Sequence, residues 1–223
     1  MTKNILVIFD CDGVLVDSEI IACSLRVKQL NKLGIRISLE DFISHFSGKK
    51  PEDTEELIED RYNIKLPVDY HTSHKNRLLD SYKNNLKAIK DIDLVLKNYG
   101  FKAVASNGNL EKINTALSLT ELDQYFDTKN IFSAEMVEKP KPSPDLYLYV
   151  CEKMGVEPEN SLIIEDSISG LQAAQDAGIP AIAFTAGSHF LTKEQSDLLK
   201  TENYLSMIDN SKELEAFIKS YKN

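Results

Sequence analysis

The sequence has few cysteines and no long apolar run. Its three cysteines, Cys11, Cys23 and Cys151, show no metal-ligand spacing, so we expect reduced thiols, as is usual in the cytoplasm. No stretch approaches the ~18 consecutive apolar residues that a membrane-spanning helix requires. Residues 1–4 lead directly into a short apolar run that contains an acid, which is unlike a secretory signal. These absences predict a cytoplasmic protein without a membrane partner.

Basic residues are also scarce relative to acidic ones. The chain of 223 residues has 26 Lys and Arg against 35 Asp and Glu, a formal net charge of −9. A nucleic-acid partner requires a basic face, and none is indicated. An acidic protein that binds an anionic substrate has to concentrate a few cations locally, so individual lysines near acids are informative.

Apolar, β-rich runs alternate with helical patterns along the chain. Continuous apolar strands are typical of a parallel sheet that is buried on both faces. Their alternation with helices predicts an α/β fold, here a doubly wound, Rossmann-like and mostly parallel sheet. The runs lie at 4–9, 101–105, 131–132, 161–164 and 181–184, and a last strand is expected near 203–206.

The segment between the first two runs is longer than one crossover helix requires. It has no good strand, and its helical patterns lie at 18–33, 39–46, 52–61 and 68–98. A small α-helical domain inserted after the first strand explains the surplus. We therefore predict an α/β core domain from residues 1–16 and 84–223 and an inserted helical domain from 17–83.

The most informative stretch is residues 9–19, FDCDGVLVDSE, directly after the first apolar run. Asp10 and Asp12 are two positions apart, so in an extended chain their side chains point to the same side. The carboxyl end of a parallel strand is where α/β sheets hold their active sites. Two acids this close need a cation, or one of them must keep its proton. Both conditions suit phosphoryl transfer, with one Asp as nucleophile, the other handling a proton, and Mg²⁺ on the phosphate. The alternative is a turn that favours Asp and Gly for backbone reasons.

Two further stretches are candidates for binding the phosphate. Ser106, Asn107 and Gly108 end the second run before a helix, where a hydroxyl and backbone N–H groups form either a phosphate cradle or an ordinary N-cap. The loop at 138–145, EKPKPSPD, has three prolines that stiffen it and fix the direction of its lysines. A rigidly held lysine can neutralise a transferring phosphate, although a solvated surface loop has the same composition.

A second acidic pair, Glu165 and Asp166, ends the fourth run and opens a helix. Mg²⁺ prefers hard oxygen ligands, usually one or two carboxylates with waters and phosphate, so Asp166 is the candidate second carboxylate. Read alone, Asp-Ser before a helix is a common N-cap. The four stretches are chemically complementary and lie at or near strand ends. Together they favour phosphoryl transfer.

In order and type, these four stretches resemble the motifs of the haloacid dehalogenase superfamily of phosphotransferases with an aspartate nucleophile. The inserted helical domain resembles the cap of its β-phosphoglucomutase-like branch. The resemblance implies that Asp10 is the nucleophile, that Asp12 acts first as acid and then as base, and that Ser106 and the Asn107 backbone hold a phosphate oxygen.

The resemblance also implies a lysine that neutralises charge, and a metal. Two registers of the family's Lys-Pro-x-Pro pattern are possible, starting at Lys139 or Lys141. In the second register a Pro-Asp pair falls where family members often have one, which favours Lys141. Mg²⁺ is implied on Asp10, the Asp12 carbonyl and Asp166, with Glu165 acting through a water.

In such proteins the cap closes over the site and supplies specificity. Gly48, Lys49 and Lys50 resemble the family's specificity loop, and Lys75 is a further candidate for substrate contact; solvated lysines are the alternative. Basic cap residues suit a sugar acid phosphate. The stretches FDCDG, FSGKK, LKAI and SNG, which begin at residues 9, 46, 86 and 106, are similar to bacterial 6-phosphogluconate phosphatases of this superfamily.

We therefore expect a monomer that hydrolyses a small phosphorylated sugar or sugar acid with Mg²⁺, with 6-phosphogluconate as first candidate. A sugar phosphomutase would use the same nucleophile but keep water away from it. A non-catalytic phosphosugar-binding protein would keep only the fold. A haloacid dehalogenase needs neither Asp12 nor the magnesium carboxylates, so these residues count against that activity. The helical insertion counts against a response-regulator receiver, which has none after its first strand.

Overall fold

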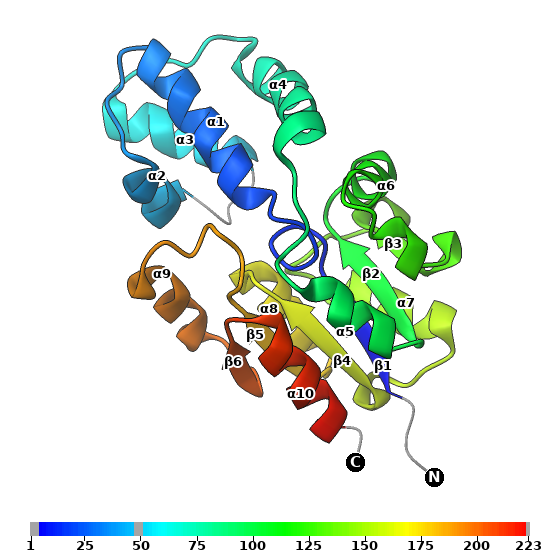
Figure 1. Cartoon of the computed structure of the whole chain (residues 1–223). Helices are drawn as coiled ribbons and strands as arrows, with labels where there is room; N and C mark the ends of the chain where they lie inside the picture. Colours follow the sequence, from blue (N-terminus) through cyan, green and yellow to red (C-terminus); the bar gives the residue numbers. More distant parts are fainter. Residues whose placement is uncertain (1–4, 47–50, 222–223) are drawn as a thin grey trace. The chain divides into compact units, whose positions relative to one another are not determined.

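The computed structural model describes residues 5–46 and 51–221. The chain divides into two compact units (Figure 1). One contains the residues up to Asp17 and from Lys87 onward, and the other is Ser18–Leu86. We call the first the α/β unit and the second the helical unit. In the described ranges no helix is both long and apolar enough to cross a bilayer.

The sheet of the α/β unit contains six strands in the described residues, in the order β3-β2-β1-β4-β5-β6. All neighbouring strands are parallel. The chain winds outward from β1 in both directions, so the topological switch point lies between β1 and β4. The predicted doubly wound parallel sheet is confirmed. The strands are β1 (Leu6–Phe9), β2 (Lys102–Ser106), β3 (Ile131–Ser133), β4 (Ser161–Glu165), β5 (Ala181–Phe184) and β6 (Ser206–Ile208).

Helices cover both faces of this sheet (Figure 1). On one face α7 and α8 pack against each other, and on the other α5 packs against α10. The helices of this unit are α5 (Ile92–Asn98), α6 (Leu110–Leu119), α7 (Asp145–Met154), α8 (Ile168–Asp176), α9 (Lys193–Asp197) and α10 (Ser211–Tyr221). Short 3₁₀ turns lie at Asp123–Tyr125, Thr128–Asn130, Ala134–Met136, Pro158–Asn160 and Leu198–Thr201.

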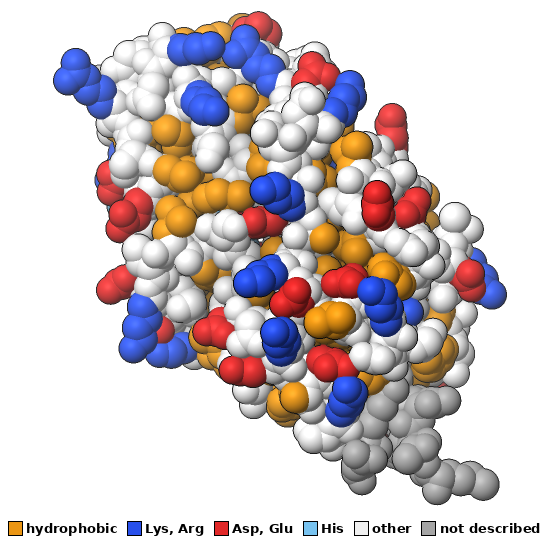
Figure 2. Space-filling model, viewed as in Figure 1, with side chains coloured by type: hydrophobic (Ala, Val, Ile, Leu, Met, Phe, Trp, Pro, Cys, Tyr) orange, Lys and Arg blue, Asp and Glu red, His pale blue; other side chains and the backbone are white. Residues whose placement is uncertain are grey.

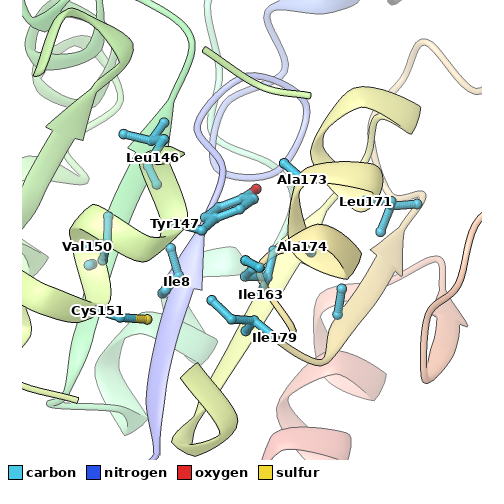
Figure 3. Close-up of a cluster of buried hydrophobic side chains, with 14 of the residues drawn as sticks. Ile8, Leu146, Tyr147, Val150, Cys151, Ile163, Leu171, Ala173, Ala174 and Ile179 are labelled. Carbon is cyan, nitrogen blue, oxygen red and sulfur yellow. The ribbon is translucent and has the colours of Figure 1, made fainter. Parts of the chain in front are cut away.

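The main core lies between the sheet and the α7–α8 layer. Figure 3 shows Ile8 and Ile163 of the central strands packed against Val150 and Ala174 from the two helices. Because these strands are apolar on both faces, they are buried throughout. Cys151 lies in this cluster as a free thiol. The core therefore holds β1 and β4 in place, and with them the residues that follow the carboxyl ends of these strands.

The helical unit consists of α1 (Glu19–Lys32), α2 (Leu39–Phe46), α3 (Pro51–Tyr62) and α4 (Tyr70–Asn85) in its described part. Leu30, Phe42, Phe46 and Ile58 form its own smaller core.

On the surface of the α/β unit, acidic and basic side chains alternate over the face seen in Figure 2.

Two element predictions are wrong. The helical pattern at 68–98 is interrupted, because Leu86 is extended and Asp91 has a left-handed φ of 61°. This stretch bonds instead to the first motif: the Asp17 N–H donates to the Lys87 carbonyl at 2.9 Å. The last strand is Ser206–Ile208, not 203–206, because its pairing with β5 sets the register.

Candidate active site

Acidic side chains lie where β1 and β4 end. The two strands pair in parallel with Phe9 opposite Ile164, so Asp10 and Glu165 are neighbours at the carboxyl edge of the sheet. The chain then continues into Asp166. All three carboxylates are buried, at the switch point where doubly wound sheets bind their ligands.

Lys141 is the cation among these acids. Its side chain is 2% exposed. Nζ donates to Asp10 Oδ1 and Glu165 Oε1, both at 2.7 Å, and to the Ala105 carbonyl at 2.9 Å. An ammonium group has three donors, and all three are used here. Lys139 is exposed. Of the two registers allowed by the sequence, the structure therefore brings Lys141 to the carboxylates.

Asn107 fixes the backbone of this lysine. Its side-chain oxygen accepts the Lys141 N–H at 3.0 Å, and its Nδ2 donates to the Lys141 carbonyl at 3.1 Å. Asn107 directly follows β2, so the end of that strand positions the lysine loop. From the sequence we expected only a backbone contact from Asn107, and its side-chain bonds are an additional finding.

Ser106 ends β2 and is 2% exposed. Its Oγ accepts the Gly108 N–H at 3.1 Å. This N–H is therefore already bonded within the turn, whereas the predicted phosphate cradle would leave it open. The N-cap of α6 is Asn109, whose side chain accepts the Lys112 N–H at 2.8 Å. The capping alternative therefore applies to Asn109, and Ser106 lies outside the helix at the end of the strand that pairs with β1.

Asp12 pairs with a lysine that the sequence did not single out. Lys112 Nζ lies 2.7 Å from Asp12 Oδ2, and both side chains are partly accessible, at 30% and 17%. Lys112 is on the first turn of α6, directly after the turn that contains Ser106. The second carboxylate of the first motif thus has its own cation, separate from the buried Lys141.

Glu165 is held entirely by protein donors. Its Oε2 accepts the Asp166 N–H, the Ser167 N–H and the Ser167 hydroxyl, each at 2.9 Å. Its Oε1 accepts the Tyr147 hydroxyl at 3.1 Å, in addition to the buried lysine. Figure 3 shows Tyr147 at the carboxyl end of β1. A carboxylate has about four lone-pair sites, and protein donors occupy those of Glu165. Glu165 therefore organises the turn after β4.

Asp166 packs directly against the turn of the first motif. A Cβ at Gly13 would lie 1.7 Å from Asp166 Oδ2, and Gly13 has a φ of +78°. Both facts require glycine at this position. His189, which the sequence also did not single out, places its Nε2 3.3 Å from the same Oδ2. The ring is 8% exposed.

Burial and charge act against each other in this cluster. Burial raises the pKa of Asp10 well above its usual value; Lys141 opposes this effect, and the charges of Glu165 and Asp166 add to it. Burial would lower the pKa of Lys141, but the charges of Asp10 and Glu165 outweigh it and raise that pKa. Lys141 pairs with two of the three carboxylates, Asp10 and Glu165, so the formal charge of the cluster is negative and favours a further cation.

The donor set fits a magnesium ion. No three His, Cys, Asp or Glu side chains form a ligand-like group within residues 5–46 and 51–221. Magnesium in phosphoryl-transfer sites needs only one or two carboxylates, since waters and phosphate oxygens complete its octahedron. Asp10 and Asp166 can supply that pair. The excess of negative charge beside them is the feature that favours a divalent cation.

The predicted substrate contacts belong to the helical unit. Lys75 is exposed on α4. Gly48, Lys49 and Lys50 lie outside the described residues. The contribution of these four residues to substrate binding stays a prediction.

His189 and Tyr147 had no local signal in the sequence, and Lys112 had only a weak one. Lys112 follows its N-cap by three residues, which is the one regularity that pointed toward it. His189 lies in the segment after β5, and only the pairing of β5 with β4 brings that segment to Asp166. Tyr147 is an apolar-face position of α7, and its hydroxyl contact is visible only in three dimensions.

Comparison with known proteins gives a consistent picture. The pattern of the haloacid dehalogenase-like hydrolase family matches residues 7–184. A 6-phosphogluconate phosphatase of Escherichia coli is 28% identical over 191 residues, which cover 85% of this chain and 86% of the relative. A phosphorylated carbohydrates phosphatase of Thermotoga maritima is 26% identical over 212 residues, covering 91% and 97%.

A solved structure is also very similar. It belongs to a haloacid dehalogenase-like protein of unknown function from Agrobacterium tumefaciens, with a TM-score of 0.91 and 30% identity. The superposition covers 98% of this chain and 99% of the other.

Proposed function

The chain belongs to the haloacid dehalogenase-like hydrolase family, as its four motifs predicted, and we propose that it hydrolyses a small phosphorylated sugar or sugar acid with Mg²⁺. The observation that carries this proposal is the buried Lys141 between Asp10 and Glu165, in a cluster whose net charge is negative. Such a cluster suits an enzyme that binds a cation together with a phosphate.

Asp10 is the proposed nucleophile. A carboxylate oxygen of Asp10 attacks phosphorus and displaces the sugar oxygen, which forms a phosphorylated Asp10. Asp12 gives its proton to the departing oxygen, so a neutral alcohol leaves. Lys141 keeps Asp10 in place and offsets the charge that accumulates as phosphate and carboxylate approach each other.

Water completes the reaction. Asp12, now ionised, takes a proton from a water whose oxygen attacks phosphorus. The bond between phosphorus and the Asp10 oxygen breaks, inorganic phosphate leaves and both carboxyl groups return to their starting states. The role proposed for Ser106, at the end of β2, is to donate its hydroxyl to a phosphate oxygen.

Asp10, Asp166 and the Asp12 carbonyl are the proposed holders of Mg²⁺. When bound, the ion neutralises charge on the transferring phosphate. We assign Glu165 to holding Lys141 and the turn after β4 rather than to a water contact with the ion, because protein donors already surround it.

Lys112 favours an anionic sugar. Asp12 is the group that would meet the leaving oxygen, and Lys112 Nζ lies 2.7 Å from its Oδ2. A second negative group on the leaving sugar would therefore meet a cation close to the reacting bond. The Escherichia coli relative named 6-phosphogluconate phosphatase makes 6-phosphogluconate the first substrate to examine.

Phosphate release from a panel of phosphorylated sugars and sugar acids tests the proposal. We expect turnover that requires Mg²⁺, is highest with a phosphorylated sugar acid and is abolished by Asp10→Asn. Transfer of phosphate to a second sugar position without release would indicate a mutase. Binding of the panel without either reaction, by folded protein with Mg²⁺, would contradict the proposal and indicate a binding protein.

A further inference from the structure

The segment after β5 reaches back to the first motif. Ser188 is held there by Asp17: its N–H donates to Asp17 Oδ1 at 2.9 Å, and its hydroxyl donates to Asp17 Oδ2. Asp17 is in turn held through its own N–H by the Lys87 carbonyl at 2.9 Å. Because both carboxylate oxygens are engaged, the direction of the chain at Ser188 is fixed, and His189 follows immediately.

The ring of His189 lies in a slot shaped for it. A Cβ at Gly187 would lie 2.7 Å from two atoms of the ring, and a Cβ at Gly13 would lie 3.1 Å from its Cε1. The Phe190 ring lies against it, with centroids 4.1 Å apart. Two glycines and an aromatic ring thus define one orientation of the imidazole, in which Nε2 faces Asp166 Oδ2 at 3.3 Å.

We propose that His189 is a positioning residue for the divalent cation, acting through Asp166. A donor on Oδ2 limits rotation of the carboxylate about its Cβ–Cγ bond, and it therefore sets the direction of Oδ1. Carboxylates that ligate metals are commonly held in this way by outer hydrogen-bonding partners. Ser188 and Asp17 supply the anchor that keeps the imidazole at its place.

Packing alone does not account for a histidine here. The slot is closed by glycines and an aromatic ring, which an apolar side chain would fill at lower cost of desolvation. The polar contact to Asp166 instead places a ring nitrogen beside a buried carboxylate that lies against the Asp12–Gly13 turn. Asp166 therefore faces the first motif, whereas the Oε2 atom of Glu165 accepts the donors of its own turn.

Binding of Mn²⁺ to the full chain, followed by the electron paramagnetic resonance signal of free Mn²⁺, tests this inference without turnover. His189→Gln and His189→Met both keep a side chain of similar length, but only glutamine has an N–H donor. We expect H189M to weaken Mn²⁺ binding by about 10- to 100-fold, the usual effect of removing an outer partner of a metal ligand. H189Q should restore most of this loss. His45→Met, on the exposed part of α2, is the control for loss of an imidazole and should bind as the wild type does.

The outcomes separate this inference from the proposed function, on which it rests. Equal Mn²⁺ affinity of folded H189M and wild type overturns the positioning role, and so does an equal loss in H189M and H189Q. A wild-type protein that binds no Mn²⁺ contradicts the proposed metal chemistry itself. Circular dichroism of each variant establishes that the fold is retained before affinities are compared.

Discussion

The two units both bury polar side chains, but they balance them differently. In the α/β unit, Lys141 is shared by Asp10 and Glu165, and negative charge remains in excess. In the helical unit, the buried amide of Gln29 meets the ring of His74, with Oε1 and Nδ1 2.7 Å apart. This pair joins α1 to α4 and leaves no charge to be compensated.

Arg26, a buried cation of the helical unit, is also balanced within that unit. It lies 3.4 Å from Glu55 of α3 and stacks over the Tyr70 ring at 5.8 Å. These contacts tie three helices together. Helix packing therefore explains the polar cluster of the helical unit, whereas the cluster of the α/β unit has a charge imbalance that packing does not explain.

Removing one of the carboxylates of the α/β unit should have the largest effect and tests the difference in charge balance between the two units. Asp10→Asn should lower phosphate release by about 10⁴-fold or more, as loss of a nucleophile does. It should leave the thermal unfolding temperature unchanged or raise it, because the buried negative charge decreases. Loss of activity together with a large loss of stability would mean that Asp10 is structural.

Removing the shared cation should have the opposite effect on stability. Lys141→Met removes the cation that Asp10 and Glu165 share, and breaking a buried pair in this way costs about 3–5 kcal/mol of unfolding free energy. Lys139→Met, two residues away and exposed, is the matched control and should stay within about 0.5 kcal/mol. Urea unfolding measures both. Equal effects of the two substitutions would contradict the role assigned to Lys141.

The helical unit should show its own dependence on pH. Burial, aided by the charges of Arg26 and His71, lowers the pKa of His74 from 6.5 to about 3. Below pH 6.5 the unfolded chain therefore binds a proton that the folded chain does not. Stability from this group is complete above that pH and falls toward pH 3, by at most about 1.4 kcal/mol per pH unit.

Urea unfolding of wild type and His74→Gln at pH 7.5 and pH 5 checks this expectation. The wild type should lose up to about 2 kcal/mol more than the variant over this interval. His45→Gln, at an exposed position of α2, should leave the pH dependence of the wild type intact. A parallel decline of wild type and H74Q would mean that His74 is not the group that titrates.

The smallest expected effect decides which unit recognises the substrate's second charge. Lys112→Met should raise KM for a phosphorylated sugar acid by about tenfold, equivalent to about 1.4 kcal/mol, and leave KM for a neutral sugar phosphate nearly unchanged. Lys75→Met makes the same change on the helical unit. A selective effect of Lys75 alone would place charge recognition there and not beside Asp12.

The sequence predicted the parts of the site that are local. Apolar runs located β1 and β4, and the acids that follow them, Asp10 and Asp166, could be assigned because parallel strands end at one edge. The break between α4 and α5 could not be predicted, since hydrogen bonds from the distant first motif determine it.

The remaining site residues depend on tertiary contacts. The residues alone left the choice between Lys139 and Lys141 open; in the structure Lys141 is the one that is buried and paired with the carboxylates. His189 reaches Asp166 only because β5 pairs with β4 and Asp17 holds the following segment. No spacing along the chain contains that information.

The most direct test of Asp10 as the nucleophile is to trap the phosphorylated carboxylate. Enzyme with substrate and Mg²⁺ is quenched with borohydride, which reduces an acyl phosphate to an alcohol, and the tryptic peptides are analysed by mass spectrometry. We expect reduction at residue 10, dependent on substrate and absent in Asp10→Asn. Turnover with an unmodified Asp10, or reduction at Asp12 instead, would contradict the account.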